Sequence, residues 1–137
     1  LPISQKDASE AHTGNETILL VEDEKSIRLT VGMFLEKLGY TVLAAETPEV
    51  ALEKARKHAD AIQLLVTDVI MPGMSGWDLA NRLAPDYPAI KVLYMSGYTA
   101  DVIAHRGILE DGVNFLNKPF QREELASKVR SILDRAL

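Results

Sequence analysis

Residues 17–23 are Thr-Ile-Leu-Leu-Val-Glu-Asp, an uninterrupted apolar run that ends directly in two carboxylates. A short apolar run followed at once by a polar side chain recurs three more times along the chain: Leu64–Thr67 before Asp68, Val92–Met95 before Ser96, and Val113–Asn117 before Lys118. Near-continuous apolar runs of this length are typical of strands buried on both faces of a parallel sheet. If the four runs are neighbouring strands of such a sheet, their polar ends meet at one edge.

The segments between these runs carry helix signals. Apolar residues recur at the 3.6-residue helical period after Asp23, and Gly39 stands at the usual position after a helix end. Thr47 and Pro48 form an N-cap followed by a first helical residue. The expected elements are strand Thr17–Val21, a helix to Leu38, strand Thr41–Ala45, helix Pro48–Ala59, strand Gln63–Thr67, a short helix with Leu79 and Leu83, strand Ala89–Met95, a helix capped by Thr99, strand Val113–Asn117 and helix Gln121–Ala136.

Five strand–helix units in succession predict an α/β fold with a doubly wound parallel sheet of five strands and five helices on its two faces. In such sheets ligands bind outside the carboxyl ends of the strands, where the polar residues lie. Residues 4–16 are polar, small and aperiodic. We therefore expect residues 1–15 to be a disordered or extended linker and residues 16–137 to form one domain.

Composition excludes several classes of function. The 137 residues contain no cysteine, so a disulfide framework, a zinc–cysteine site and a thiol nucleophile are impossible. The formal net charge is −5 and no basic stripe is present, which argues against nucleic acid as a partner. No apolar stretch approaches the length of a membrane span, and the N-terminus lacks a signal-peptide pattern, so we expect no direct membrane contact.

The predicted edge of the sheet brings together Glu22, Asp23 and Asp68. Three carboxylates in one place repel each other and need a compensating cation, and oxygen ligands of this kind suit Mg²⁺. We expect Asp23 and Asp68 to be direct ligands and Glu22 to act through water or as a neighbouring group. Lys118 can pair with Asp68 at rest and move to a phosphoryl oxygen, and Ser96 offers a hydroxyl donor. Asp68 is the candidate nucleophile, because carboxylates form aspartyl-phosphates.

Each of these signals has a structural explanation when taken alone. Acidic residues 22–24 favour a helix N-terminus, and Asp68, Ser96 and Lys118 are each compatible with a turn or the start of a helix. Their joint placement after four strands favours a site. No dinucleotide, P-loop or nucleophile-elbow motif competes with it. His12, His58 and His105 lie in the linker and helices, so a phosphohistidine donor must come from another domain.

The motifs Ile18–Glu24, Thr67–Gly76, Met95–Tyr98 and Asn117–Phe120 resemble those of two-component response-regulator receiver domains, and the resemblance covers about Glu16 to Leu137. It implies a flavodoxin-like sheet with strand order 2-1-3-4-5. It further implies a phospho-acceptor, two metal acids, a further Mg²⁺ ligand, a hydroxyl switch, a switch aromatic and a charge-neutralising lysine. The phospho-acceptor is Asp68, the metal acids are Glu22 and Asp23, and the further Mg²⁺ ligand is the backbone carbonyl of Ile70. The hydroxyl switch is Ser96, the switch aromatic is Phe115 and the charge-neutralising lysine is Lys118. The Lys118–Pro119 bond is expected to be cis.

The resemblance also implies a function. A partner phosphohistidine, on a histidine kinase or a histidine phosphotransfer domain, passes its phosphoryl group to Asp68 and switches the surface around the fourth helix, the fifth strand and the fifth helix. The isolated domain would catalyse only its own phosphorylation and a slow dephosphorylation, because neither Ile70 nor Tyr98 can orient a hydrolytic water. The alternatives are a docking module of the same fold that works without phosphorylation and, less favoured, a Mg²⁺-dependent phosphatase, which needs a carboxylate where Ile70 stands.

A finer likeness concerns the parent protein. Met95–Tyr98 followed by Thr99–Asp101 is similar to receivers at the C-terminus of hybrid sensor histidine kinases, and Leu1-Pro2 is similar to the end of a kinase ATP-binding domain. We expect such a parent, which can itself be membrane-anchored, and a cytoplasmic receiver that is a monomer or weak dimer. A stand-alone response regulator is the alternative parent. Because the chain stops after its last helix, no DNA-binding output domain is expected.

Overall fold

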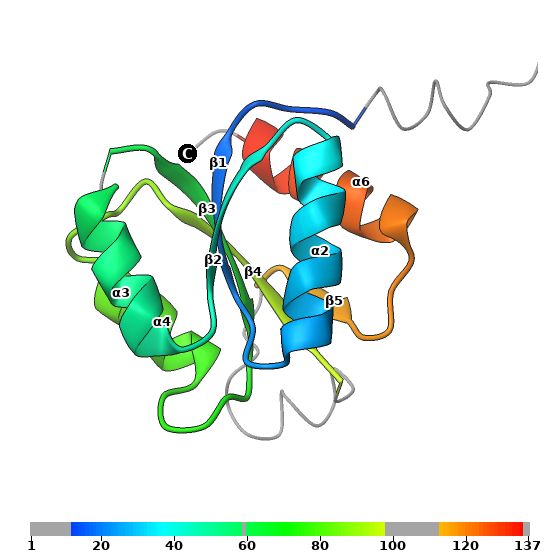
Figure 1. The fold of residues 1–137 in the computed structure, drawn as a ribbon. Coiled ribbons are helices and arrows are strands. Elements are labelled where there is room, and N and C mark those ends of the chain that lie inside the picture. The colour runs from blue at the N-terminus through cyan, green and yellow to red at the C-terminus, as the bar shows by residue number, and fades with distance from the viewer. Residues whose placement is uncertain (1–11, 59, 98–112, 136–137) are drawn as a thin grey trace, which may run out of the picture.

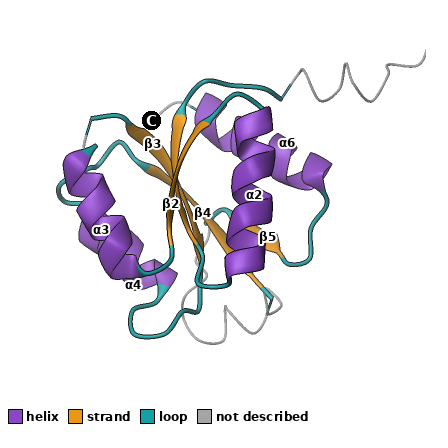
Figure 2. Ribbon diagram, in the orientation of Figure 1, coloured by secondary structure: helices purple, strands orange, loops and turns teal. Residues whose placement is uncertain are grey.

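A computed structural model describes residues 12–58, 60–97 and 113–135 of the chain. Five parallel strands form one sheet in the order β2-β1-β3-β4-β5, with helices packed on both faces (Figures 1 and 2). The strands are β1 (Thr17–Val21), β2 (Thr41–Ala45), β3 (Ile62–Asp68), β4 (Lys91–Ser96) and β5 (Phe115–Asn117). The helices in the described residues are α2 (Lys25–Lys37), α3 (Pro48–Lys57), α4 (Gly76–Leu83) and α6 (Arg122–Asp134).

The predicted fold class and strand order are confirmed. Four helices are described instead of the five predicted, because the expected helix capped by Thr99 falls within residues 98–112, which lie outside the described residues. Some predicted boundaries were wrong. β3 is one residue longer at each end than predicted, because Thr17 pairs with Ile62 and Asp68 pairs with Met95.

The predicted bounds of β4, β5, α3 and α6 also differ from those in the structure. β4 and β5 each begin two residues later than predicted, since their pairing with neighbours starts only at Lys91 and Phe115. α3 ends at Lys57 rather than near residue 59, and α6 runs from 122 to 134 rather than from 121 to 136. Helix and strand ends depend on pairing and capping, which apolar periodicity does not specify.

Two apolar cores sandwich the sheet. Ile18 and Leu20 face the layer of α2 and α6, whereas Leu19 and Val21 face the layer of α3 and α4. All four side chains are fully buried. The alternation of side chains along a strand therefore buries both faces of β1, as the continuous apolar run predicted. This double burial fixes the strand register and hence which residues stand at the carboxyl edge of the sheet.

Local signals position the helices on this sheet. The Thr47 hydroxyl accepts a hydrogen bond from the Val50 amide at 3.1 Å, as the predicted N-cap requires. Ser75 caps α4 in the same way. Gly39 follows the C-cap residue Leu38 of α2, and its φ of +104° lies in the left-handed region that glycine adopts without strain.

The chain enters the domain at the amino ends of the strands, on the opposite side of the molecule from their carboxyl ends (Figure 1). There the Gly14 amide donates to the Leu38 carbonyl at 3.0 Å, and the Thr41 amide donates to the Glu16 carbonyl at 3.0 Å. Residues 1–11 lie outside the described residues, so a linker stays a prediction for that segment.

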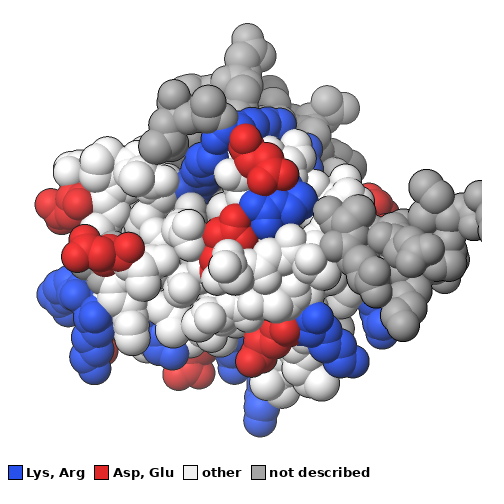
Figure 3. Space-filling view, turned by 90° about the horizontal axis from the view of Figure 1, so that it is seen from above, with Lys and Arg blue, Asp and Glu red and all other residues white. Residues whose placement is uncertain are grey.

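On this end of the molecule, basic side chains lie beside acidic ones rather than in one basic area (Figure 3). No helix in the described part of the chain is both long and apolar enough to cross a membrane.

Candidate functional site

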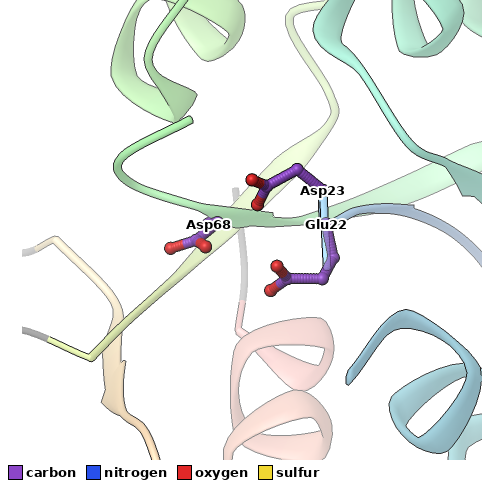
Figure 4. A group of neighbouring side chains, drawn as sticks. All are labelled: Glu22, Asp23 and Asp68. Carbon is purple, nitrogen blue, oxygen red and sulfur yellow. The ribbon is translucent and has the colours of Figure 1, made fainter. Parts of the chain in front are cut away.

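Three carboxylates meet at the carboxyl edge of the sheet. Glu22 and Asp23 follow β1 directly, and Asp68 is the last residue of β3. Because β1 and β3 are neighbours, with Val21 beside Thr67, the three side chains come together. One carboxylate oxygen from each lies within 4.8 Å of the others, and Figure 4 shows the three side chains gathered at the strand ends. The predicted meeting of these strand ends is therefore confirmed by the geometry.

Lys118 reaches this cluster from the edge strand β5. It follows β5, which is separated from β3 by β4, and its backbone amide donates to the Ser96 carbonyl at 2.8 Å. Its Nζ donates to Glu22 Oε2 at 2.6 Å and to Asp68 Oδ2 at 2.9 Å. The expected pairing with Asp68 is present, but the shorter contact is to Glu22, which the sequence did not indicate. The Lys118–Pro119 bond is cis, as the family resemblance implied.

Burial and charge act against each other at Glu22. Its side chain is only 1% exposed, and this burial raises the pKa of the carboxyl. Hydrogen bonds from Lys118 and from the Glu24 amide, the latter at 3.1 Å, act to lower that pKa, whereas the charge of Asp68 raises it further. The net effect is a raised pKa, because burial outweighs the hydrogen bonds that favour the charged carboxylate.

Lys118 shows the complementary behaviour. Burial acts to lower the pKa of its ammonium, but the hydrogen bonds to Glu22 and Asp68 and their negative charges outweigh burial and raise that pKa. The ammonium is therefore a permanent charge in the site. One ammonium faces three carboxylates, which leaves an excess of negative charge next to the exposed Asp23.

The donor set fits a hard divalent cation. Carboxylate oxygens are preferred ligands of Mg²⁺, at bond lengths near 2.1 Å. Two oxygens bound to one such ion lie at most about 4.2 Å apart. Oxygens already within 4.8 Å of one another need only a small side-chain adjustment to share an ion. The excess negative charge supplies the electrostatic reason to bind one.

The remaining predicted residues surround this cluster. Ser96 is the last residue of β4, buried at 1% exposure, and lies across the strand pair from Asn117. Phe115 is the first residue of β5 and pairs with Tyr94. The side chains of Phe115 and Ile70 are half-buried and pack on the core beneath α3 and α4. Tyr98, the second residue expected beside the path of a hydrolytic water, lies outside the described residues.

Arg28 is a nearby residue that the sequence did not single out. It lies in α2, and its Nη1 donates to the Glu22 carbonyl at 2.8 Å, with a longer contact of 3.5 Å to the Asp23 carbonyl. The available signal was a lone arginine five and six residues after the paired acids. Spacing alone does not show that a side chain turns back past the start of its own helix.

Comparisons with known proteins identify relatives. The sequence model of the family described as the response regulator receiver domain matches residues 18–130. The chain is 36% identical over 123 residues to the sensor kinase CckA of Brucella abortus (strain 2308), covering 90% of this chain and 13% of that protein. It is 30% identical over 116 residues to the response regulator receiver protein CpdR of the same strain, covering 85% of this chain and 95% of CpdR.

A solved structure shows the same likeness. The receiver domain of the hybrid histidine kinase CckA is 36% identical, with a TM-score of 0.68, and the match covers 86% of this chain and 99% of that domain. The chain spans between 10% and 52% of the length of four curated relatives, the sensor kinase among them. The likeness to those longer proteins is therefore a likeness to one of their parts.

Proposed function

Because this chain belongs to the family of response regulator receiver domains, we propose that it is a phosphorelay domain that accepts a phosphoryl group on Asp68. The observation that carries the proposal is the position of the Asp68 carboxylate at the carboxyl edge of the sheet, where it lies beside two other acids and 2.9 Å from the Lys118 ammonium. Phosphoryl transfer requires mainly positioning and neutralisation of charge. The chain supplies both with groups drawn from β1, β3 and β5.

In the proposed reaction an Asp68 oxygen attacks the phosphorus of a partner phosphohistidine. The phosphorus–nitrogen bond breaks, its electron pair stays on the imidazole nitrogen, and the imidazole takes up a proton from water. Lys118 leaves Asp68 for a phosphoryl oxygen while Glu22, its nearer partner, continues to hold the ammonium. Asp23, Asp68 and the carbonyl of Ile70 would hold Mg²⁺ directly and Glu22 through water, and the ion would neutralise phosphoryl charge when bound.

Ser96 and Phe115 are the proposed switch residues. The aspartyl-phosphate adds roughly two negative charges, by analogy with phosphoserine. The buried Ser96 hydroxyl would donate to a phosphoryl oxygen, and the half-buried Phe115 ring would move inward. The surface around β5, α6 and the expected fourth helix, which falls outside the described residues, would then change shape. In physical terms, the phosphoryl group biases an equilibrium between two arrangements that both exist beforehand.

We propose that the phosphoryl group comes from a histidine kinase or a histidine phosphotransfer domain. The likeness to the receiver domain of the hybrid histidine kinase CckA supports a hybrid-kinase parent over a stand-alone response regulator. In that setting the receiver is a cytoplasmic monomer or weak dimer. Nucleic acid and direct membrane contact are not part of this proposal.

The test is phosphorylation by a small donor. Incubation with Mg²⁺ and acetyl phosphate, followed by intact mass spectrometry, should add one phosphoryl group to the wild type and none to Asp68→Ala. Asp78→Ala, which removes a carboxylate at the start of α4, is the matched control and should be modified normally. A wild type that takes no phosphoryl group from any donor would favour a docking module. Turnover of a phosphomonoester would favour a phosphatase.

A further inference from the structure

The acid loop, residues 22–24, is held unevenly. Glu22 is fixed by its amide hydrogen bond to the Ala45 carbonyl at 3.1 Å and by the partners of its carboxylate, Lys118 and the Glu24 amide. Within the described residues, by contrast, no hydrogen bond or ion pair holds the exposed Asp23 carboxylate. The position of Asp23 therefore depends on the backbone that carries it.

Helix capping does not supply this restraint. Glu24 is the N-cap residue of α2, but its side chain makes no capping hydrogen bond, and the first turn of the helix contains no acidic residue. A loop that begins a helix without a side-chain cap retains much of its conformational freedom, and fixing one backbone residue costs about 1–2 kcal/mol. Besides the hydrogen bond from the Glu24 amide to the Glu22 carboxylate, a contact to the carbonyls on either side of Asp23 would restrain the loop further.

We propose that Arg28 is a positioning residue that holds the acid loop for the divalent cation. Its guanidinium donates to the Glu22 carbonyl at 2.8 Å and lies 3.5 Å from the Asp23 carbonyl, so one side chain contacts both peptide groups that flank the Asp23 carboxylate. Arg28 acts through these carbonyls and does not touch the cation. The inference rests on the metal site of the proposed function.

The two properties of Arg28 affect cation binding with opposite sign. Its hydrogen bonds order the acid loop and strengthen binding, whereas its positive charge repels a cation and weakens binding. Removing both should weaken binding only if the ordering effect is the larger one. Groups that orient metal ligands typically contribute 10–100-fold in affinity, so we expect roughly tenfold weaker Mg²⁺ binding in Arg28→Met. Arg28→Lys keeps a donor and the charge and should recover part of that loss.

The experiment is a Mg²⁺ titration of the full chain, followed by calorimetry and by the fluorescence of Trp77, the only tryptophan. The matched control is Lys25→Met, which removes an exposed positive charge from the first turn of the same helix, where the lysine side chain makes no hydrogen bond or ion pair with the acid loop. Lys25→Met should bind Mg²⁺ as tightly as the wild type or slightly more tightly. Urea unfolding without Mg²⁺ checks that each variant is folded.

A kinetic measurement separates positioning from a general structural role. Acetyl phosphate should modify Arg28→Met at the wild-type rate when Mg²⁺ is saturating and more slowly when Mg²⁺ is scarce. The proposal is overturned if folded Arg28→Met, or Arg28→Gln where Met fails to fold, binds Mg²⁺ within twofold of the wild type. A wild type that binds Mg²⁺ but is never phosphorylated would remove the proposed function and leave the inference about Arg28 standing.

Discussion

Replacement of Arg130 by methionine should lower the free energy of unfolding of the domain. Arg130 lies in α6 and holds both carboxylate oxygens of Glu16, at 2.6 and 3.1 Å, just ahead of β1. It also donates to the Thr13 carbonyl at 3.1 Å and to Asp134 at 2.8 and 3.1 Å. One guanidinium thus ties the chain that enters the sheet to the last helix.

The magnitude follows from the exposure of the partners. The Glu16 and Arg130 side chains are 15% and 18% exposed, so their paired hydrogen bonds are partly shielded and contribute about 1.5–3 kcal/mol. Asp134 is 62% exposed and lies one helical turn away, where such a pair contributes only about 0.3–0.5 kcal/mol. Arg130→Met should therefore lower the free energy of unfolding by about 2–3 kcal/mol, which corresponds to a fall in Tm of about 10 °C.

Urea unfolding monitored by Trp77 fluorescence measures this loss, with Asp134→Ala as the matched control. The control should cost less than about 0.5 kcal/mol. The pH dependence gives a second check. Arg130 holds the pKa of Glu16 below its ordinary value of 4.5, so the pair stabilises the fold above pH 4.5 and loses its effect as pH falls through the lowered pKa. The gap between variant and wild type should narrow in that acidic range. A loss of stability no larger than that of Asp134→Ala would show that the Glu16–Arg130 pair does not stabilise the fold.

Three further outcomes are expected. Lys118→Met should abolish phosphorylation by acetyl phosphate and should lower the free energy of unfolding by about 3 kcal/mol, because it leaves the buried Glu22 carboxylate without its ion-pair partner. Lys118→Arg should retain most of the stability, and a Met variant as stable as the wild type would contradict the expected loss. Burial raises the pKa of Tyr94 to about 12, so its phenol contributes fully to stability below pH 10, and the free energy of unfolding should fall by about 3 kcal/mol as pH rises from 10 to 12. Denaturant titrations should show this loss in the wild type and not in Tyr94→Phe. The aspartyl-phosphate should hydrolyse slowly, since Ile70 offers no group to orient water; decay within seconds, followed by intact mass, would contradict this.

The sequence predicted those parts of the site that depend on strand ends. Apolar runs placed Glu22, Asp23 and Asp68 at the carboxyl edge, because burial on both faces fixes where each strand lies. The sequence did not predict the shorter bond of Lys118 to Glu22. The two residues are 96 positions apart, and the choice between two carboxylates depends on rotamers and on the register of β5. Arg28 and Arg130 were missed for the same reason, since both contacts run from long side chains to partners that periodicity does not locate.

The distances around Lys118 give Glu22 and Asp68 different tasks. If Lys118 were held by Asp68 alone, its transfer to an incoming phosphoryl oxygen would leave a half-buried ammonium without a fixed partner during the reaction. The 2.6 Å contact to Glu22, which is itself fixed by the Glu24 amide, removes that difficulty. The ammonium can exchange its 2.9 Å contact with Asp68 for a phosphoryl oxygen and keep its stronger partner. This arrangement gives a reason for a nearly fully buried glutamate beside the two aspartates of the proposed metal site, although burial raises the pKa of that glutamate. Its carboxylate holds the lysine in place, and Asp23 and Asp68 remain to face the cation.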